Sequence, residues 1–262
     1  MERKINWIAQ FKNQDDPSLH IILAYAAGDA FGAFYEFNGR HETIPNVLKA
    51  KDSWPFGGVS DDTLLTLLTI QSMESERPGH KYLELIRKNL NNLRGLGPTT
   101  RSALGLYVKP DERGEIGNTN GAMMRSALCG LANFSEQSII DVIKVTHSKS
   151  EAIEYSLAMV ELFRGSSVPD FPKPKDEVGL SPKDTYKAVC YVVNHSNSVA
   201  NAYANACALG GDTDTVAALS GALFLRSFKD PNFQEIDWLS EINWSEVAVG
   251  INSAVEVLRK NS

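Results

Sequence analysis

The chain has 262 residues, of which 43% are hydrophobic and 22% charged, as is ordinary for a soluble globular protein. This length suffices for one large domain with a substantial core, or for two small domains. The formal net charge of −6 argues against a general nucleic-acid-binding protein, because such proteins usually carry a basic excess.

The cysteines and the N-terminal segment indicate a compartment. The three cysteines, Cys129, Cys190 and Cys207, are widely spaced and form no CxxC pattern, so we expect buried, reduced side chains. Residues 1–12 are too polar for a signal peptide, and no apolar run approaches the length of a membrane span. We therefore expect a cytoplasmic protein without membrane contacts.

The helical period dominates the chain up to residue 164. Residues 19–34 are apolar nearly all round, which predicts a helix buried in the interior. Ser60 is a suitable N-cap for a helix to about residue 75, and the Pro78-Gly79 turn is expected to end it. The other helices predicted in this part span 81–93, 135–147 and 150–163.

The rest of the chain begins with residues 165–182, which contain four prolines and form the only long irregular segment we expect, a surface excursion or a lid-like loop. Ser181 then begins a helix, with Pro182 at the first position and Asp184 in the first turn. Because convincing alternating strands are absent, we predict an all-α, single-domain orthogonal multi-helix bundle over residues 1–262. Its last helices are predicted over 196–209, 216–227 and 245–260.

Two distant segments combine a glycine pair with acids and hydroxyls. Residues 57–63 read Gly-Gly-Val-Ser-Asp-Asp-Thr and residues 210–215 read Gly-Gly-Asp-Thr-Asp-Thr, each followed by an apolar run. An ordinary helix N-terminus explains one acid in each segment, because one side chain is enough for a cap and acids suit the helix dipole. The second acid of each pair is left without a structural role. We therefore interpret the two segments as parts of one metal site.

A third segment, residues 28–37, adds Asp29 and Glu36. An ionised Asp29 inside an apolar helix is costly unless it is paired or metal-bound; the alternative is an acid that caps a neighbouring helix or accepts backbone hydrogen bonds. Glu36 follows seven residues later and shares the face of Asp29 if the helix continues. The alternative for Glu36 is a solvated residue at the end of a helix.

Oxygen donors dominate this set of side chains, and they indicate Mg²⁺, Mn²⁺ or Ca²⁺ rather than zinc or copper. The histidines form no HExxH pattern. Five carboxylates exceed what one octahedral Mg²⁺ usually recruits, which favours two ions bridged by shared carboxylates. The seven oxygen-bearing residues are Glu36, Ser60, Asp61, Asp62, Asp212, Asp214 and Thr215.

These motifs, in this order, resemble the ADP-ribosylglycohydrolase family, typified by the glycohydrolase that reactivates dinitrogenase reductase. The matching segments are 28–37, 60–63, 120–125 (Asn-Gly-Ala-Met-Met-Arg) and 210–215, which span about two thirds of the chain. The resemblance implies an all-α fold with two Mg²⁺ or Mn²⁺ ions in a cleft, and Asp29 as the buried acid beneath them. The implied metal ligands are Ser60, Asp61, Asp62, Asp212, Asp214 and Thr215.

The resemblance also implies how the substrate is held. Because no basic cluster is evident, backbone N–H groups of 117–121 are expected to cradle a diphosphate, with glycines permitting close approach. We expect Arg125 to be structural, and a core histidine is the alternative for His147. The implied substrate-binding residues are Gly117, Asn118, Thr119, Asn120, Gly121 and His147.

The chain departs from the family pattern at two places. Ser60 replaces the commoner threonine and keeps the hydroxyl. Residues 95–100 contain no acid, whereas some members carry there an acid proposed to act in catalysis, so Glu36 remains a candidate for proton transfer. The triplet 34–36 (Phe-Tyr-Glu) resembles the branch that acts on serine-linked ADP-ribose, in which the glutamate is a ligand and a gate.

The expected reaction is hydrolysis of the C1″ glycosidic bond of an ADP-ribosylated protein or a small ADP-ribosyl adduct, through oxocarbenium-like charge. Two metal ions would orient the ribose hydroxyls and lower the pKa of a bound water. Glu36, Asp61 and Asp214 are the candidate catalytic proton acceptors, and the sequence leaves the choice open. The alternatives are a hydrolase of another ribosyl or nucleotide substrate and a non-catalytic ADP-ribose-binding protein, which the retained acids disfavour.

Overall fold

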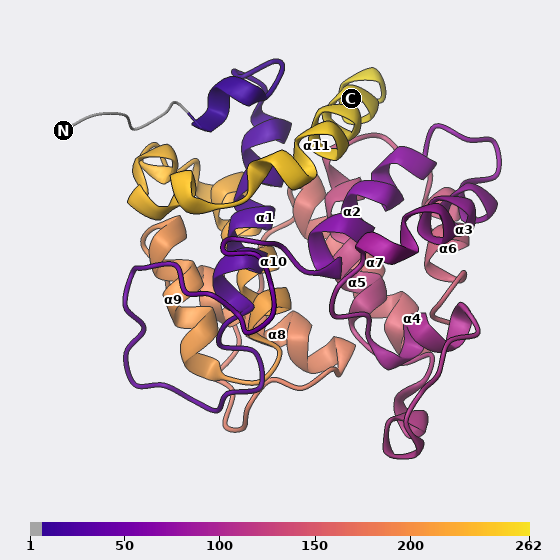
Figure 1. Cartoon of the computed structure of the whole chain (residues 1–262), viewed down its shortest axis with the longest axis horizontal. Helices are drawn as coiled ribbons and strands as arrows, with labels where there is room; N and C mark the ends of the chain where they lie inside the picture. The colour runs from indigo at the N-terminus through magenta and orange to yellow at the C-terminus, as the bar shows by residue number, and fades with distance from the viewer. Residues whose placement is uncertain (1–6) are drawn as a thin grey trace.

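Two helices that are far apart in the sequence lie together at the centre of the molecule. The computed structural model describes residues 7–262, and Figure 1 shows α1, in indigo, beside α10, in orange. The α-helices are α1 (Pro17–Gly32), α2 (Asp61–Ser72), α3 (Pro78–Asn89), α4 (Pro98–Ala103), α5 (Gly121–Ser126), α6 (Glu136–Ile143), α7 (Ser150–Arg164), α8 (Pro182–Asn194), α9 (Val199–Leu209), α10 (Thr213–Phe228) and α11 (Trp244–Lys260). Short 3₁₀ turns are η1 (Trp7–Gln10), η2 (Leu90–Asn92), η3 (Pro110–Glu115), η4 (Ala127–Leu131), η5 (Phe233–Glu235) and η6 (Asp237–Glu241).

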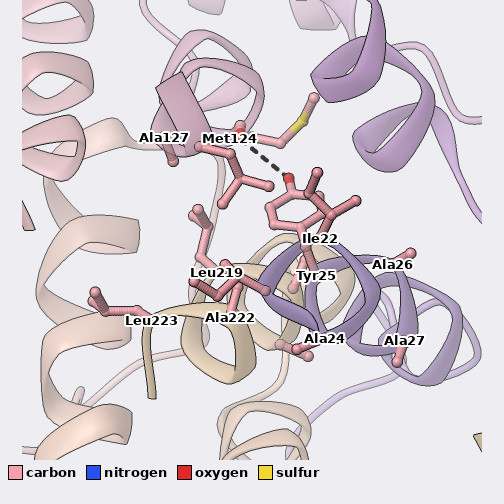
Figure 2. Packing of buried hydrophobic residues seen from close by; sticks show 14 of the residues in the cluster. Ile22, Ala24, Tyr25, Ala26, Ala27, Met124, Ala127, Leu219, Ala222 and Leu223 are labelled. Atoms are coloured by element: carbon pink, nitrogen blue, oxygen red, sulfur yellow. Dashed lines mark hydrogen bonds between the residues drawn. The ribbon is translucent and has the colours of Figure 1, made fainter. Parts of the chain in front are cut away.

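Glycines allow α1 and α10 to approach closely. A Cβ atom on Gly28 would lie 2.5 Å from the carbonyl oxygen of Ala217, closer than real Cβ atoms come to a backbone oxygen. Figure 2 shows the packing beside this contact, where Tyr25 of α1 reaches across to α5. The Tyr25 hydroxyl donates a hydrogen bond of 3.1 Å to the carbonyl oxygen of Met124, so this buried polar group is satisfied. The contacts fix α1, α5 and α10 relative to one another.

The all-α prediction is confirmed, and every predicted helix forms. Ser60, Ser135 and Ser181 each accept a hydrogen bond from a backbone N–H in the first turn of the helix that follows, which is the expected N-cap geometry. Within residues 7–262 no strand forms, and one isolated bridge pairs Val178 with Gly211. The three cysteines are free and buried. None of the described helices combines the length and apolarity needed to cross a membrane.

Two expectations about the boundaries were wrong, and two short helices were missed. Pro78 begins α3 at its first position instead of ending α2, which already stops at Ser72, because proline suits the first turn of a helix. The segment 165–182 is not the only long irregular one, since residues 33–60 also form turns and extended chain. Nor were the six-residue helices α4 and α5 predicted, because so short a stretch shows no clear helical period.

Candidate functional site

Asp29 anchors the first turn of α2. Its carboxylate accepts hydrogen bonds from the backbone N–H of Ser60, at 3.0 Å, and from the N–H and hydroxyl of Thr63, at 3.1 and 2.5 Å. A helix start leaves such N–H groups without partners inside the helix, and Asp29, which is fully buried, supplies the acceptor from another helix. The alternative in which Asp29 caps a neighbouring helix is therefore confirmed. The same bonds hold Asp61 and Asp62 in place at the start of α2.

The glycine pair sets the start of α10. Gly211 has φ +81°, and a Cβ there would meet the carbonyl oxygen of Val178 at 2.1 Å, so a larger residue does not fit. The N–H of Asp212 donates to that same oxygen at 2.7 Å, and the hydroxyl of Thr213 donates to the carbonyl oxygen of Gly32 at 2.9 Å. The Thr213 bond holds the first turn of α10 at the end of α1, and the Asp212 bond connects it to the segment before α8.

Three carboxylates meet where α1 and α10 join. One oxygen from each of Glu36, Asp212 and Asp214 lies within 4.8 Å of the other two. The helix does not continue from Asp29 to Glu36, because α1 ends at Gly32. A following turn, in which the Tyr35 N–H donates to the Gly32 carbonyl at 2.9 Å, carries Glu36 to the cluster instead.

The three carboxylates open into a cleft of about 200 Å³. Asp61, Asp62 and Thr215 line it as well, and the Thr215 hydroxyl donates to Oδ2 of Asp62 at 2.6 Å, linking α10 to α2. Ser60 is buried and does not line the cleft; its hydroxyl accepts from the N–H of Asp62 at 3.0 Å. The lining residues are Glu36, Phe37, Asp61, Asp62, Gly95, Leu96, Gly97, Pro98, Thr100, Arg101, Glu112, Thr119, Asn120, Gly121, Met124, Leu180, Asp212, Asp214 and Thr215.

Burial makes the four aspartates of the cleft hard to ionise. It raises the pKa of Asp212 from 3.8 to about 6. Burial, followed by the repulsion of neighbouring acids, raises the pKa values of Asp61, Asp62 and Asp214 well above the usual range. Among residues 7–262, Lys51 forms an ion pair with a carboxylate of the cluster, that of Glu36. A concentration of desolvated oxygen ligands with so little positive charge fits a hard divalent cation.

Part of the loop before α5 lines the cleft. Thr119, Asn120 and Gly121 line it, whereas Gly117 and Asn118 do not. The side-chain amide of Asn120 donates to Oδ2 of Asp212 and, at 2.9 Å, to the hydroxyl of Thr185. Asn120 therefore orients one of the candidate metal ligands, a task that outer residues of metal sites commonly perform.

Two backbone N–H groups of this loop are already used inside the protein. The Gly117 N–H donates to the Thr99 hydroxyl at 3.1 Å, and the Asn120 N–H donates to the Leu180 carbonyl at 2.8 Å. The side chain of Asn118 is bound to Glu151 at 2.8 Å. Two of the five backbone N–H groups that the sequence analysis expects to cradle a diphosphate therefore have partners within the protein.

His147 lies behind the wall of the cleft. It is fully buried, and its ring nitrogens form hydrogen bonds with the hydroxyls of Thr119, at 2.9 Å, and Thr146, at 2.7 Å. Burial lowers its pKa from 6.5 to about 3, so the imidazole is neutral at physiological pH. The geometry agrees with the core-histidine alternative, and the ring holds Thr119, which does line the cleft.

Arg125 connects two helices, as expected of a structural residue. Its Nη2 donates to the carbonyl oxygens of Val142 and Ile143, at 3.1 and 3.2 Å, and to the hydroxyl of Thr146 at 2.9 Å. The same two carbonyl oxygens also accept backbone N–H bonds from the turn that follows α6, so Arg125 is an additional donor to them. Arg125 thereby joins α5 to α6, away from the cleft lining.

The sequence reasoning missed one wall of the cleft. Arg101, at α4, and Glu112, in η3, both line it, and their side chains form an ion pair of 2.8 Å. Neither residue belongs to a recognised motif, and no short-range pattern joins positions eleven residues apart on two short elements. The only available signal was the resemblance of 95–100 to a family loop that borders the cleft.

The fold and the site together define an all-α protein with an acid-lined cleft between helix starts. The ADP-ribosylglycohydrolase family model matches residues 13–173, and the chain belongs to this family. Family and fold support a hydrolase of the ADP-ribosylglycohydrolase type.

One solved structure, described as an ADP-ribosylglycohydrolase-related protein complex, is similar to the chain, with a TM-score of 0.73 and 22% identity. The similarity covers 95% of this chain and 99% of the other, and at this identity it establishes the fold alone. The family match ends at residue 173, before α10 begins. No curated protein matches the chain.

Proposed function

We propose that this protein is a metal-dependent hydrolase that cleaves the C1″ glycosidic bond of an ADP-ribosyl adduct and releases ADP-ribose. The observation that carries the proposal is the cluster of Glu36, Asp212 and Asp214 in the cleft, in a chain that belongs to the ADP-ribosylglycohydrolase family. The adduct is a modified protein or a small molecule, since family membership alone does not select the linkage.

The proposed ligands are the cluster itself together with Asp61, Asp62 and Thr215. We propose two Mg²⁺ or Mn²⁺ ions, because the five carboxylates that line one cleft together with Thr215, those of Glu36, Asp61, Asp62, Asp212 and Asp214, exceed what one octahedral ion usually recruits. When bound, such ions supply the positive charge that orients the ribose hydroxyls and activates an attacking water. Hydrogen bonds from Asn120 to Asp212 and from Thr215 to Asp62 orient these carboxylates in advance.

The chain's own carboxylates move the proton. Glu36, Asp61 and Asp214 all line the cleft, and each is a proposed acceptor for the proton of the attacking water. Ser60 contributes through the cap of α2, which fixes Asp61 and Asp62. Holding the water beneath C1″ supplies the proximity part of the rate acceleration.

The test is release of ADP-ribose from arginine-, serine- and nucleobase-linked substrates in the presence of Mg²⁺, Mn²⁺ or EDTA. We expect metal-dependent release from one linkage, its loss in Asp212→Asn, and its retention in the matched control Asp141→Asn, which changes an exposed acid on α6. Tight ADP-ribose binding without release from any linkage would instead indicate another ribosyl substrate or a binding protein. Unchanged hydrolysis in folded Asp212→Asn would refute the role of the acid cluster.

A further inference from the structure

Arg101 is the single Lys or Arg side chain among the described residues that line the cleft. It comes from α4 and shares the lining with Asp61, Asp62, Asp212 and Asp214. The proposed substrate carries two kinds of group that need opposite partners: a ribose diol, which suits cations held by acids, and a diphosphate, which suits a guanidinium. The lining of this cleft contains both acids and a guanidinium.

The guanidinium of Arg101 has hydrogen-bonding capacity left. Nη2 donates to Oε2 of Glu112 at 2.8 Å, and Nη1 donates to the carbonyl oxygen of Tyr107 at 3.3 Å. Its Nε is buried and has no hydrogen-bond partner. A guanidinium offers five N–H donors in a planar fork, and a buried donor without an acceptor is unfavourable. Each Nη atom uses one N–H in these two bonds, so the second N–H of each is left for an anion in the cleft.

Glu112 holds the fork in position from the next segment of the chain. Its Oε2 also accepts a hydrogen bond of 3.1 Å from the N–H of Lys109, so the carboxylate is fixed within η3. The side chains of Arg101 and Glu112 are 23% and 26% exposed, which leaves the pair accessible from the cleft. Because Glu112 lines the cleft too, its negative charge opposes an incoming phosphate.

The loop before α5 increases the need for a cation here. Its Gly117 and Asn120 N–H groups are bound to Thr99 and Leu180, so neither is available to a diphosphate without rearrangement. An arginine that donates to phosphate oxygens through two parallel bonds replaces several such amides.

We propose that Arg101 binds a phosphate of the ADP-ribosyl substrate, and that Glu112 positions its guanidinium while weakening the affinity for that anion. This inference rests on the proposed function. It assigns substrate selection for diphosphates to α4 and η3, while the acids of α2 and α10 hold the metal ions.

The experiment is calorimetric titration of ADP-ribose, in the presence of Mg²⁺, into the wild type and three variants. Arg101→Gln should weaken binding about 10- to 100-fold, the usual effect of losing charged hydrogen bonds. Glu112→Gln should strengthen binding about threefold, because it removes the opposing charge and keeps an acceptor for Arg101. Arg113→Gln, an exposed arginine of the same segment, is the matched control and should bind like the wild type.

Titration of Mg²⁺ alone and thermal melting are measured for the same proteins. Binding of Mg²⁺ should be unchanged in Arg101→Gln, and a cooperative melting transition shows that the variant is folded. Wild-type affinity for ADP-ribose in Arg101→Gln would overturn the inference and leave the proposed function intact. Equal weakening in Glu112→Gln and Arg101→Gln would also overturn it, because a purely structural ion pair loses the same function from either side. Failure of the wild type to bind ADP-ribose would refute the proposed function, and this inference with it.

Discussion

In EDTA, replacing Asp212 with Asn should stabilise the protein more at pH 7.5 than at pH 5.5. Burial raises the pKa of this carboxyl group from 3.8 to about 6. The folded chain therefore binds the proton of Asp212 more tightly than the unfolded chain does. The resulting contribution to the free energy of unfolding is fully present below pH 3.8 and is lost as the pH rises through 6. Over the interval from 5.5 to 7.5, the loss amounts to about 1 kcal/mol for Asp212 alone.

The comparison with a variant is needed because another group titrates in the opposite sense. The pKa of His147 is lowered from 6.5 to about 3 by burial, so the unfolded chain binds its proton at pH 5.5 and the folded chain does not. This costs about 1 kcal/mol of stability at pH 5.5, but it is common to both proteins and cancels from the difference. The pH dependence of the stability difference between the two proteins therefore reports Asp212 and the acids that interact with it.

The assay is urea denaturation followed by far-UV circular dichroism at the two pH values, with EDTA or Mg²⁺. Mg²⁺ at 100 times its dissociation constant should stabilise the wild type by about 2.7 kcal/mol. The gain should be larger at pH 7.5, because protons compete for the same carboxylates at pH 5.5, and it should be smaller in Asp212→Asn. A stability difference between variant and wild type that is independent of pH would refute the reasoning, and Asp141→Asn provides the control.

Two further substitutions test other parts of the site and the fold. Lys51→Met should raise the affinity for Mg²⁺ up to about fivefold, because it removes a half-buried ammonium that contacts Glu36. Such an ion pair contributes at most about 1 kcal/mol. Unchanged or weaker Mg²⁺ binding in calorimetry would contradict this prediction. Gly28→Ala should lower the free energy of unfolding by about 1–3 kcal/mol, because its Cβ would lie 2.5 Å from the Ala217 carbonyl, whereas Gly97→Ala, with nothing within 4 Å of the added Cβ, should cost far less. Equal melting temperatures for the two glycine variants would show that α1 and α10 pack less closely than described.

The helix starts could be predicted because their signals are local. Ser60, Ser135 and Ser181 precede their helices with a cap residue in the expected place, and the two acid-bearing segments fall at the first turns of α2 and α10. The sequence also predicts that Asp29 is buried within an apolar helix. It leaves two roles open for Asp29, and the contacts with Ser60 and Thr63 decide between them only after folding.

The rest of the site depends on tertiary contacts that leave no periodic pattern. Glu36 reaches the cluster through a turn, and residues 33–60 follow an irregular path that is held by long-range bonds such as Trp238 Nε1 to Asn46 Oδ1, at 2.7 Å. Arg101 and Glu112 come from two elements of six residues each. Elements this short carry too few residues for hydrophobic periodicity to place their faces, so the cleft wall that they form could not be predicted.

The acids of the site separate into one that builds the fold and others that are left for a ligand. The Asp29 carboxylate accepts hydrogen bonds from the first turn of α2, and these bonds oppose the rise in its pKa that burial causes. Its negative charge lies beneath the cleft and is itself a cause of the raised pKa values of Asp61 and Asp62, after burial. A fixed anion of this kind makes the two outer carboxylates costly to ionise without a cation and favourable partners for one. The hydrogen bonds that hold the start of α2 in place therefore also fix a negative charge that favours the binding of metal ions.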